Sequence, residues 1–317
     1  MEFANSMNLG QVYTKRKVAD YMVSLFSLKG KARVLDPCFG QGVFVKSMLE
    51  KTEFLIYGVE IDEKSFSLFK NPNTERCSLK NCDFFDIEDK YDGIIMNPPY
   101  VRQEELNALK PLGVSKQKLQ TSCGLMTISS KANLYMYFIL RSILLLRDGG
   151  ELIAIFPNSW TKTPVGKQFH EQICHHGCIT EIINVEGEAF ESSPMVDVCI
   201  MKFVKGGSGN TVYKQMTITP SDVLSITTVD KQKGNKVMSL VKLQMVAKVR
   251  RGITTGFNRL FINPTLFTQD HLVEILSSPK DIQGYSTNRC KLDTMLAIKN
   301  GDVLNEDETN YLENCSN

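Results

Sequence analysis

The chain has 317 residues and a formal net charge of +2, with 23% charged and 42% hydrophobic residues. This is ordinary globular composition, and a charge so close to zero does not identify a partner. No secretory signal and no apolar run of about 20 residues is visible, which argues against a membrane span. The nine cysteines follow no disulfide framework. We therefore expect a cytoplasmic protein that does not bind membranes.

Strand and helix patterns alternate from about residue 14 to residue 204. Thr14 is expected to cap the first helix, and Gly149-Gly150 to close the long helix over 132–146. The expected strands are 32–35, 54–59, 76–82, 91–96, 151–156, 179–185 and 196–203. Because the last two strands are joined by a loop only, they should be antiparallel. The pattern predicts an α/β fold with a doubly wound, mostly parallel sheet of seven strands.

Polar or glycine-rich residues follow successive strands, where ligands bind in a doubly wound sheet. The first strand runs into residues 36–42 (Asp-Pro-Cys-Phe-Gly-Gln-Gly), whose glycines allow the backbone to approach a ligand. Glu60 can accept from two ribose hydroxyls, Asp83 from an adenine amino group, and Phe84 offers an apolar ring. Each acid alone is more often a helix cap or a solvated residue. Together they predict a nucleoside pocket without a phosphate cradle, which suits S-adenosylmethionine.

The fourth strand ends at residues 97–100, Asn-Pro-Pro-Tyr, because proline cannot donate to a sheet ladder. This tetrapeptide is either a simple turn or a site for an aromatic amine. The lone pair of such an amine is delocalised, which makes it a poor nucleophile. The Asn97 side-chain oxygen and the Pro98 carbonyl could accept from both N–H groups and direct the lone pair outward. Pro99 would keep the turn rigid, Tyr100 would stack on the ring, and catalysis would be mostly positioning.

These motifs, in this order, resemble the γ-class N6-adenine DNA methyltransferases of bacterial restriction–modification systems. The resemblance runs from Gly10 to about Val204 and implies the class I S-adenosylmethionine-dependent methyltransferase fold. It implies that residues 97–100 are catalytic, with Tyr100 and Phe190 stacking on a flipped target adenine. The cofactor residues that it implies are Tyr13, Thr14, Asp36, Pro37, Gly40, Gly42, Glu60, Ile61, Asp83, Phe84, Asn97 and Pro99. Asparagine at position 97 favours adenine N6 over cytosine N4 in this family.

The region after residue 205 is less regular. The resemblance predicts a catalytic domain over 1–205, a connecting hairpin or linker over 206–240, and the start of a small or truncated target-recognition domain over 241–317. No acidic residue occurs from Lys231 to Gln269, so this stretch is either a solvated basic surface or a contact to the DNA backbone. The expected DNA contacts are Lys248, Arg250, Arg251 and Arg259.

The resemblance further implies a monomer that acts on double-stranded DNA, with a cognate restriction endonuclease as a possible partner. Methylation of adenine N6 in ribosomal RNA, methylation of a glutamine in a release factor, and a scaffold without activity are the alternatives. No metal site is expected. The cluster from His170 to Cys178 lacks the spacing of a zinc site and fits a helix end that runs into Gly177.

Overall fold

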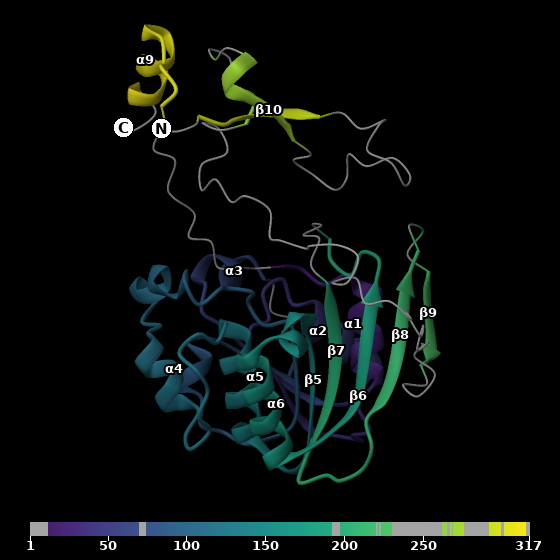
Figure 1. Cartoon of the computed structure of the whole chain (residues 1–317). Helices are drawn as coiled ribbons and strands as arrows, with labels where there is room; N and C mark the ends of the chain where they lie inside the picture. The colour runs from purple at the N-terminus through teal and green to yellow at the C-terminus, as the bar shows by residue number, and fades with distance from the viewer. Residues whose placement is uncertain are drawn as a thin grey trace. The chain divides into compact units, whose positions relative to one another are not determined.

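The computed structural model describes residues 12–69, 74–191, 197–219, 221, 223–229, 262–264, 267, 269–275, 292–298 and 301–314. The chain divides into two compact units, 1–236 and 237–317. The first unit is built on a nine-stranded sheet (Figure 1). Its strands, in spatial order, are β3 (Cys77–Asn81), β2 (Leu55–Glu60), β1 (Arg33–Asp36), β4 (Tyr91–Met96), β5 (Leu146–Pro157), β7 (Val198–Lys205), β6 (Gly177–Glu186), β8 (Val212–Ile218) and β9 (Leu224–Thr228).

Helices cover both faces of this sheet because its buried strands are apolar on both sides. In β5, Leu152, Ala154 and Phe156 belong to one core cluster, whereas Ile153 and Ile155 belong to the other. The first cluster is completed by α4 (Lys116–Ser122), α5 (Leu134–Leu145) and α6 (Pro164–His176), and the second by α1 (Arg16–Ser24) and α2 (Val43–Lys51). Figure 1 shows α5 and α6 in front of the sheet. The expected doubly wound α/β fold is confirmed.

Strands β3, β2, β1, β4 and β5 are mutually parallel, and β7 is antiparallel to both β5 and β6. The expected antiparallel last strand is therefore confirmed. The sheet has two more strands than the seven predicted. They are β8, which pairs in parallel with β6, and β9, which pairs antiparallel with β8. Both lie in the stretch 206–240, which was predicted as a hairpin or linker.

Two of the expected helix boundaries are wrong. Lys15, not Thr14, occupies the N-cap of α1. The Thr14 hydroxyl accepts a hydrogen bond from a residue at the end of β4, and its backbone forms an antiparallel bridge with Phe190. Gly149 and Gly150 lie within β5, because α5 ends at Leu145 and passes directly into that strand. The helix needs no glycine there, since the residue at its C-cap already has an extended conformation.

The second unit contains a two-stranded antiparallel sheet of β10 (Leu272–Ile275) and β11 (Asp293–Leu296). It ends in α9 (Glu306–Asn314). Asn305 and Glu308 exchange side-chain and backbone hydrogen bonds in a capping box at the start of α9. Buried Glu308 also lies 3.1 Å from the His271 Nδ1 atom, which ties the helix to the start of β10. In the described part of the chain, no helix has both the length and the apolar composition to span a membrane.

Candidate active site at the carboxyl ends of the strands

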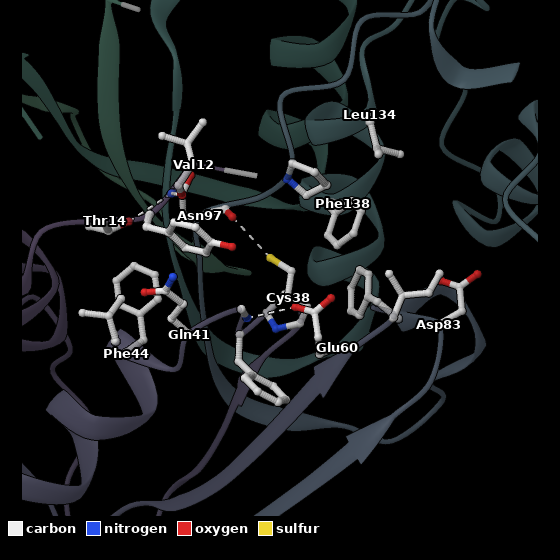
Figure 2. A pocket seen from close by; sticks show the side chains of 18 of the residues that line it. Val12, Thr14, Cys38, Gln41, Phe44, Glu60, Asp83, Asn97, Leu134 and Phe138 are labelled. Carbon is white, nitrogen blue, oxygen red and sulfur yellow. Dashed lines mark hydrogen bonds between the residues drawn. The ribbon is translucent and has the colours of Figure 1, made fainter. Parts of the chain in front are cut away.

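A cavity of about 180 Å³ opens at the edge of the sheet where β1, β2, β3 and β4 end (Figure 2). The parallel order of these strands brings together residues that are far apart in the sequence. Of the predicted cofactor residues, the cavity is lined by Tyr13, Thr14, Pro37, Gly40, Glu60, Ile61, Asp83, Phe84, Asn97 and Pro99. Asp36 and Gly42 are not among the lining residues and shape the loop behind it.

The loop after β1 turns tightly into α2 through two glycines with positive φ angles, Gly40 at +50° and Gly42 at +74°. A Cβ atom added to Gly42 would lie 2.0 Å from the Phe69 ring, so a side chain here would force that ring to move and would be strained by the positive φ angle. Asp36 is completely buried, and its Oδ1 atom accepts the Cys38 N–H at 3.3 Å. Its Oδ2 atom has no hydrogen-bond partner among the described residues. Burial raises the pKa of Asp36 to about 8.

The protonation of Asp36 should make the stability of the chain depend on pH. In the unfolded chain this carboxyl has an ordinary pKa of about 3.9, whereas in the folded chain it keeps its proton to about pH 8. The folded state then binds more protons, so the free energy of unfolding falls as pH rises from about 4 to about 8. Asp36→Asn lacks this titration, and its stability relative to the wild type should increase over that window. Urea unfolding at about pH 5 and about pH 8 measures the difference, and a pH-independent difference contradicts the prediction.

Glu60 follows β2 and is buried beside the loop. Its two carboxylate oxygens accept the backbone N–H groups of Gly40 and Asp62, each at 2.9 Å. Burial raises the pKa of this carboxyl, and the two amide donors oppose that effect. Each oxygen retains a second lone pair. Glu60 therefore holds the glycine loop in place and still presents an acceptor to the cavity that it lines.

Each of the two carboxylate oxygens of Asp83 accepts one hydrogen bond. Oδ1 accepts the Phe85 N–H at 3.0 Å, which caps the short helix η1 (Phe84–Asp86). Oδ2 accepts from Lys118 Nζ in α4 at 2.8 Å. Phe84 stacks on Phe138 of α5, with ring centroids 5.1 Å apart. Lys118 was missed by sequence reasoning, because it lies 35 positions after Asp83 in a stretch without a motif.

The stretch 101–130 contains the 3-10 helix η2 (Leu106–Leu112) and α4. Most of its apolar residues are buried, although Leu125 is fully exposed, and Leu109, Leu112 and Val114 line the cavity. They add apolar side chains to a lining that also contains the carboxylates Glu60 and Asp83.

Asn97 follows β4, and two hydrogen bonds hold the nitrogen end of its side-chain amide. Its Nδ2 atom donates to the Val12 carbonyl at 2.6 Å and to Thr14 Oγ1 at 3.0 Å. Its Oδ1 atom is buried and meets no partner in the described residues. Because a carbonyl can only accept, the bond to Val12 fixes which end of the amide faces it. Figure 2 shows this side chain beside Val12 and Thr14, with Cys38 below it. The Cys38 thiol donates to the Asn97 backbone carbonyl at 3.4 Å.

Tyr100 and Phe190 meet edge to face, with ring centroids 6.1 Å apart. The Tyr100 hydroxyl donates to the Ile155 carbonyl at 3.3 Å, and burial raises its pKa well above the usual value. A base inserted between the two rings would have to separate them, whereas a base against one face would not. The expected DNA contacts Lys248, Arg250, Arg251 and Arg259 lie outside the described residues.

Comparison with known proteins finds similarity to one family over part of the chain. Residues 46–190 match the Eco57I restriction-modification methylase family. The chain is 30% identical over 208 residues to the type II methyltransferase M.HincII of Haemophilus influenzae, covering 65% of this chain and 39% of that protein. It is 27% identical over 267 residues to the type II methyltransferase M.AccI of Acinetobacter calcoaceticus, covering 72% of this chain and 48% of that protein. The chain thus spans less than half the length of these relatives.

Solved structures show the same fold at low sequence identity. One, from Listeria monocytogenes, is described as a class I S-adenosylmethionine-dependent methyltransferase. It has a TM-score of 0.51 and 15% identity, over 67% of this chain and 68% of that one. Another is the methyltransferase subunit of a type I restriction-modification system from Streptococcus thermophilus. Its TM-score is 0.50 and its identity 16%, over 65% of this chain and 47% of that one. The first unit therefore has the class I methyltransferase fold, and the chain resembles the methylases of restriction–modification systems.

Proposed function

We propose that this chain transfers a methyl group from S-adenosylmethionine to N6 of an adenine flipped out of double-stranded DNA. The observation that carries the proposal is the state of Asn97, whose amide is held by Val12 and Thr14. Its buried Oδ1 is left without a partner among the residues that the structure describes. A buried acceptor without a donor is costly, so it points to a ligand that brings one.

The cavity suits an adenosine with a sulfonium side chain. Phe84 and Phe138 present apolar rings, and Glu60 and Asp83 present carboxylates from neighbouring strands. We assign ribose to Glu60 with Ile61, adenine to Asp83 and Phe84, and the methionine part to Tyr13 and Thr14. The remaining contacts are assigned to Pro37, Gly40 and Pro99. When bound, this cofactor supplies a methyl group on a positively charged sulfur.

The protein's contribution to the chemistry is to orient the acceptor amine. Asn97 Oδ1 and the Pro98 carbonyl accept from the two N–H groups of adenine N6, which turns the lone pair toward the methyl group. Tyr100 and Phe190 hold the flipped base by stacking, worth about 1–3 kcal/mol per base, which offsets the few kcal/mol that extrusion costs. No strong general base is required, because the N6 proton leaves after the methyl group has been transferred.

The relatives support a place in a restriction–modification system, and we extend it to the γ class. We propose the following arrangement for the whole protein. Residues 1–205 form the catalytic domain, 206–240 add β8 and β9 to its sheet and connect it onward, and 241–317 begin the target-recognition domain. Lys248, Arg250, Arg251 and Arg259 contact the DNA backbone, the protein works as a cytoplasmic monomer, and a restriction endonuclease is its partner.

Gly42 gives a direct test of the cofactor loop. Gly42→Ala adds a Cβ atom 2.0 Å from the Phe69 ring at a φ of +74°, a conformation that costs an L-residue about 1–2 kcal/mol. The affinity for S-adenosylmethionine, measured by calorimetry, should fall about tenfold. Gly30→Ala is the matched control, because Gly30 has a similar φ of +57° with nothing within 4 Å. Equal affinities in both variants contradict the assignment of this loop to the cofactor.

Transfer of a radiolabelled methyl group from S-adenosylmethionine tests the proposal as a whole. The substrates are unmethylated genomic DNA, ribosomal RNA and release factor, each with the wild type and with Asn97→Ala. We expect label in DNA, recovered as N6-methyladenine and lost in the variant. Label only in RNA or in protein would overturn the DNA assignment. Cofactor binding without transfer to any substrate would favour a scaffold.

A further inference from the structure

Thr14 makes contacts with Asn97 and Phe190 that the cofactor-binding role assigned to it does not explain. Its side chain is 2% exposed, and its hydroxyl accepts from Asn97 Nδ2 at 3.0 Å. Its backbone forms an antiparallel bridge with Phe190. Two hydrogen bonds flank that bridge, Lys15 N–H to the Ala189 carbonyl and Glu191 N–H to the Tyr13 carbonyl, both at 2.9 Å. One residue therefore touches both the amide and the loop that carries the aromatic ring.

We propose that Thr14 is a positioning residue that fixes the orientation of the Asn97 amide and places Phe190 beside it. This inference rests on the proposed function for its catalytic meaning, since Asn97 Oδ1 is taken to receive the target amine. The contacts themselves are independent of that function. They join residues 12–15 by hydrogen bonds to the end of β4 and to residues 189–191.

The hydroxyl acts on the amide through hydrogen-bond direction. An asparagine amide has two donors on nitrogen and acceptors on oxygen. With Val12 O and Thr14 Oγ1 as acceptors, both N–H groups of Asn97 have partners, and Oδ1 is turned away from them. Loss of the Thr14 acceptor leaves one buried N–H without a partner, and the amide is then held at a single point. Its oxygen would spend less time in the orientation that receives the target amine.

Thr14→Val removes the hydroxyl at nearly constant shape, and Thr14→Ser keeps it. We expect kcat for DNA methylation to fall about fivefold to tenfold in Thr14→Val, the loss of one neutral hydrogen bond. The Kd for S-adenosylmethionine should change less than kcat, because the Thr14 hydroxyl bonds Asn97, and Tyr13 is assigned to the same part of the cofactor. Thr14→Ser should lose less kcat than Thr14→Val, because it keeps the hydroxyl. Thr180→Val is the matched control, because among the described residues its hydroxyl bonds the Lys202 carbonyl in the sheet and is not part of the cavity lining.

A second readout needs neither cofactor nor DNA. In the full chain labelled with ¹⁵N-asparagine, the Asn97 side-chain amide signal is identified by its disappearance in Asn97→Ala. Thr14→Val should move this signal and speed its hydrogen exchange, whereas Thr14→Ser and Thr180→Val should leave it in place. An unchanged signal in Thr14→Val would overturn the proposal even if kcat fell.

The two measurements separate the possible failures. If the wild type transfers no methyl group to DNA, the proposed function fails, and the amide signal still tests the contact. If the wild type is active but Thr14→Val weakens only S-adenosylmethionine binding, Thr14 acts through the cofactor alone and is not a positioning residue. A loss of activity in Thr180→Val equal to that in Thr14→Val would show that the effect is general destabilisation.

Discussion

Asn97→Asp should lower kcat for methyl transfer by about 10²–10³-fold, the usual effect of losing one group that stabilises the transition state. The variant keeps an oxygen where the target amine would be received. It also places a carboxylate oxygen where Asn97 Nδ2 now lies, 2.6 Å from the Val12 carbonyl oxygen. Two oxygens at that distance repel each other unless a proton lies between them. The Thr14 hydroxyl can donate instead of accept, but the Val12 carbonyl cannot.

This repulsion gives the variant its own pH dependence. A protonated carboxyl at position 97 could donate to Val12 and present its other oxygen to the amine, much as the asparagine does. The methyl-transfer rate of Asn97→Asp should therefore rise as pH falls. A variant that has simply lost the asparagine amide should show no such rise. Asn97→Ala, which has no acid to titrate, should be equally slow at every pH. Steady-state rates of both variants across pH provide the measurement, and a parallel pH profile for the two would contradict the expectation.

Lys202→Met should destabilise the first unit by about 3–5 kcal/mol, because it leaves a buried carboxylate without its cation. Lys202 Nζ lies 3.1 Å from Glu151 Oε1, and both residues are less than a tenth exposed. The ammonium also donates to the Leu25 carbonyl at 2.6 Å and to Ser27 Oγ at 2.8 Å. The ion pair thus connects β5 and β7 to the segment after α1. Urea unfolding followed by circular dichroism measures the loss.

Two further variants make this prediction specific. In Lys202→Met with Glu151→Gln, the buried charge is gone and the glutamine oxygen can still accept the Ser27 N–H, which now donates to Glu151 at 2.7 Å. Most of the lost stability should return. Lys167→Met removes a surface lysine whose side chain is 82% exposed, and it should cost less than about 1 kcal/mol. A double variant as unstable as Lys202→Met would contradict the role of the unpaired charge.

The sequence predicts local features of this fold well. Apolar runs that stop at Asp36, Glu60 and Asn97 mark strand ends, and because the strands are parallel, these residues meet at one edge. The antiparallel last strand followed from the absence of a crossover helix between it and its neighbour. These inferences need only the short-range pattern of each segment and a rule for connecting strands.

Contacts between distant residues could not be predicted in the same way. A polar residue just before a helix suggested a cap at Thr14. The Thr14 hydroxyl instead accepts from Asn97, 83 positions away. Lys118 looks like any helical surface lysine until the fold brings it to Asp83. Strands β8 and β9 follow a glycine-rich turn, and their pairing depends on the free edge of β6 that only the assembled sheet provides.

The pairing of Tyr13–Lys15 with Ala189–Glu191 has a consequence for the order in which the site matures during synthesis. The strand-end residues that line the cavity occur early, and β1, β2, β3 and β4 can pair once residue 96 has been made. Residues 189–191, which pair with Tyr13–Lys15, are synthesised almost a hundred residues later. Closing so long a loop is slow compared with local pairing. A nascent chain should therefore assemble the strand ends that carry Asp36, Glu60 and Asn97 well before residues 189–191 pair with the segment around Thr14.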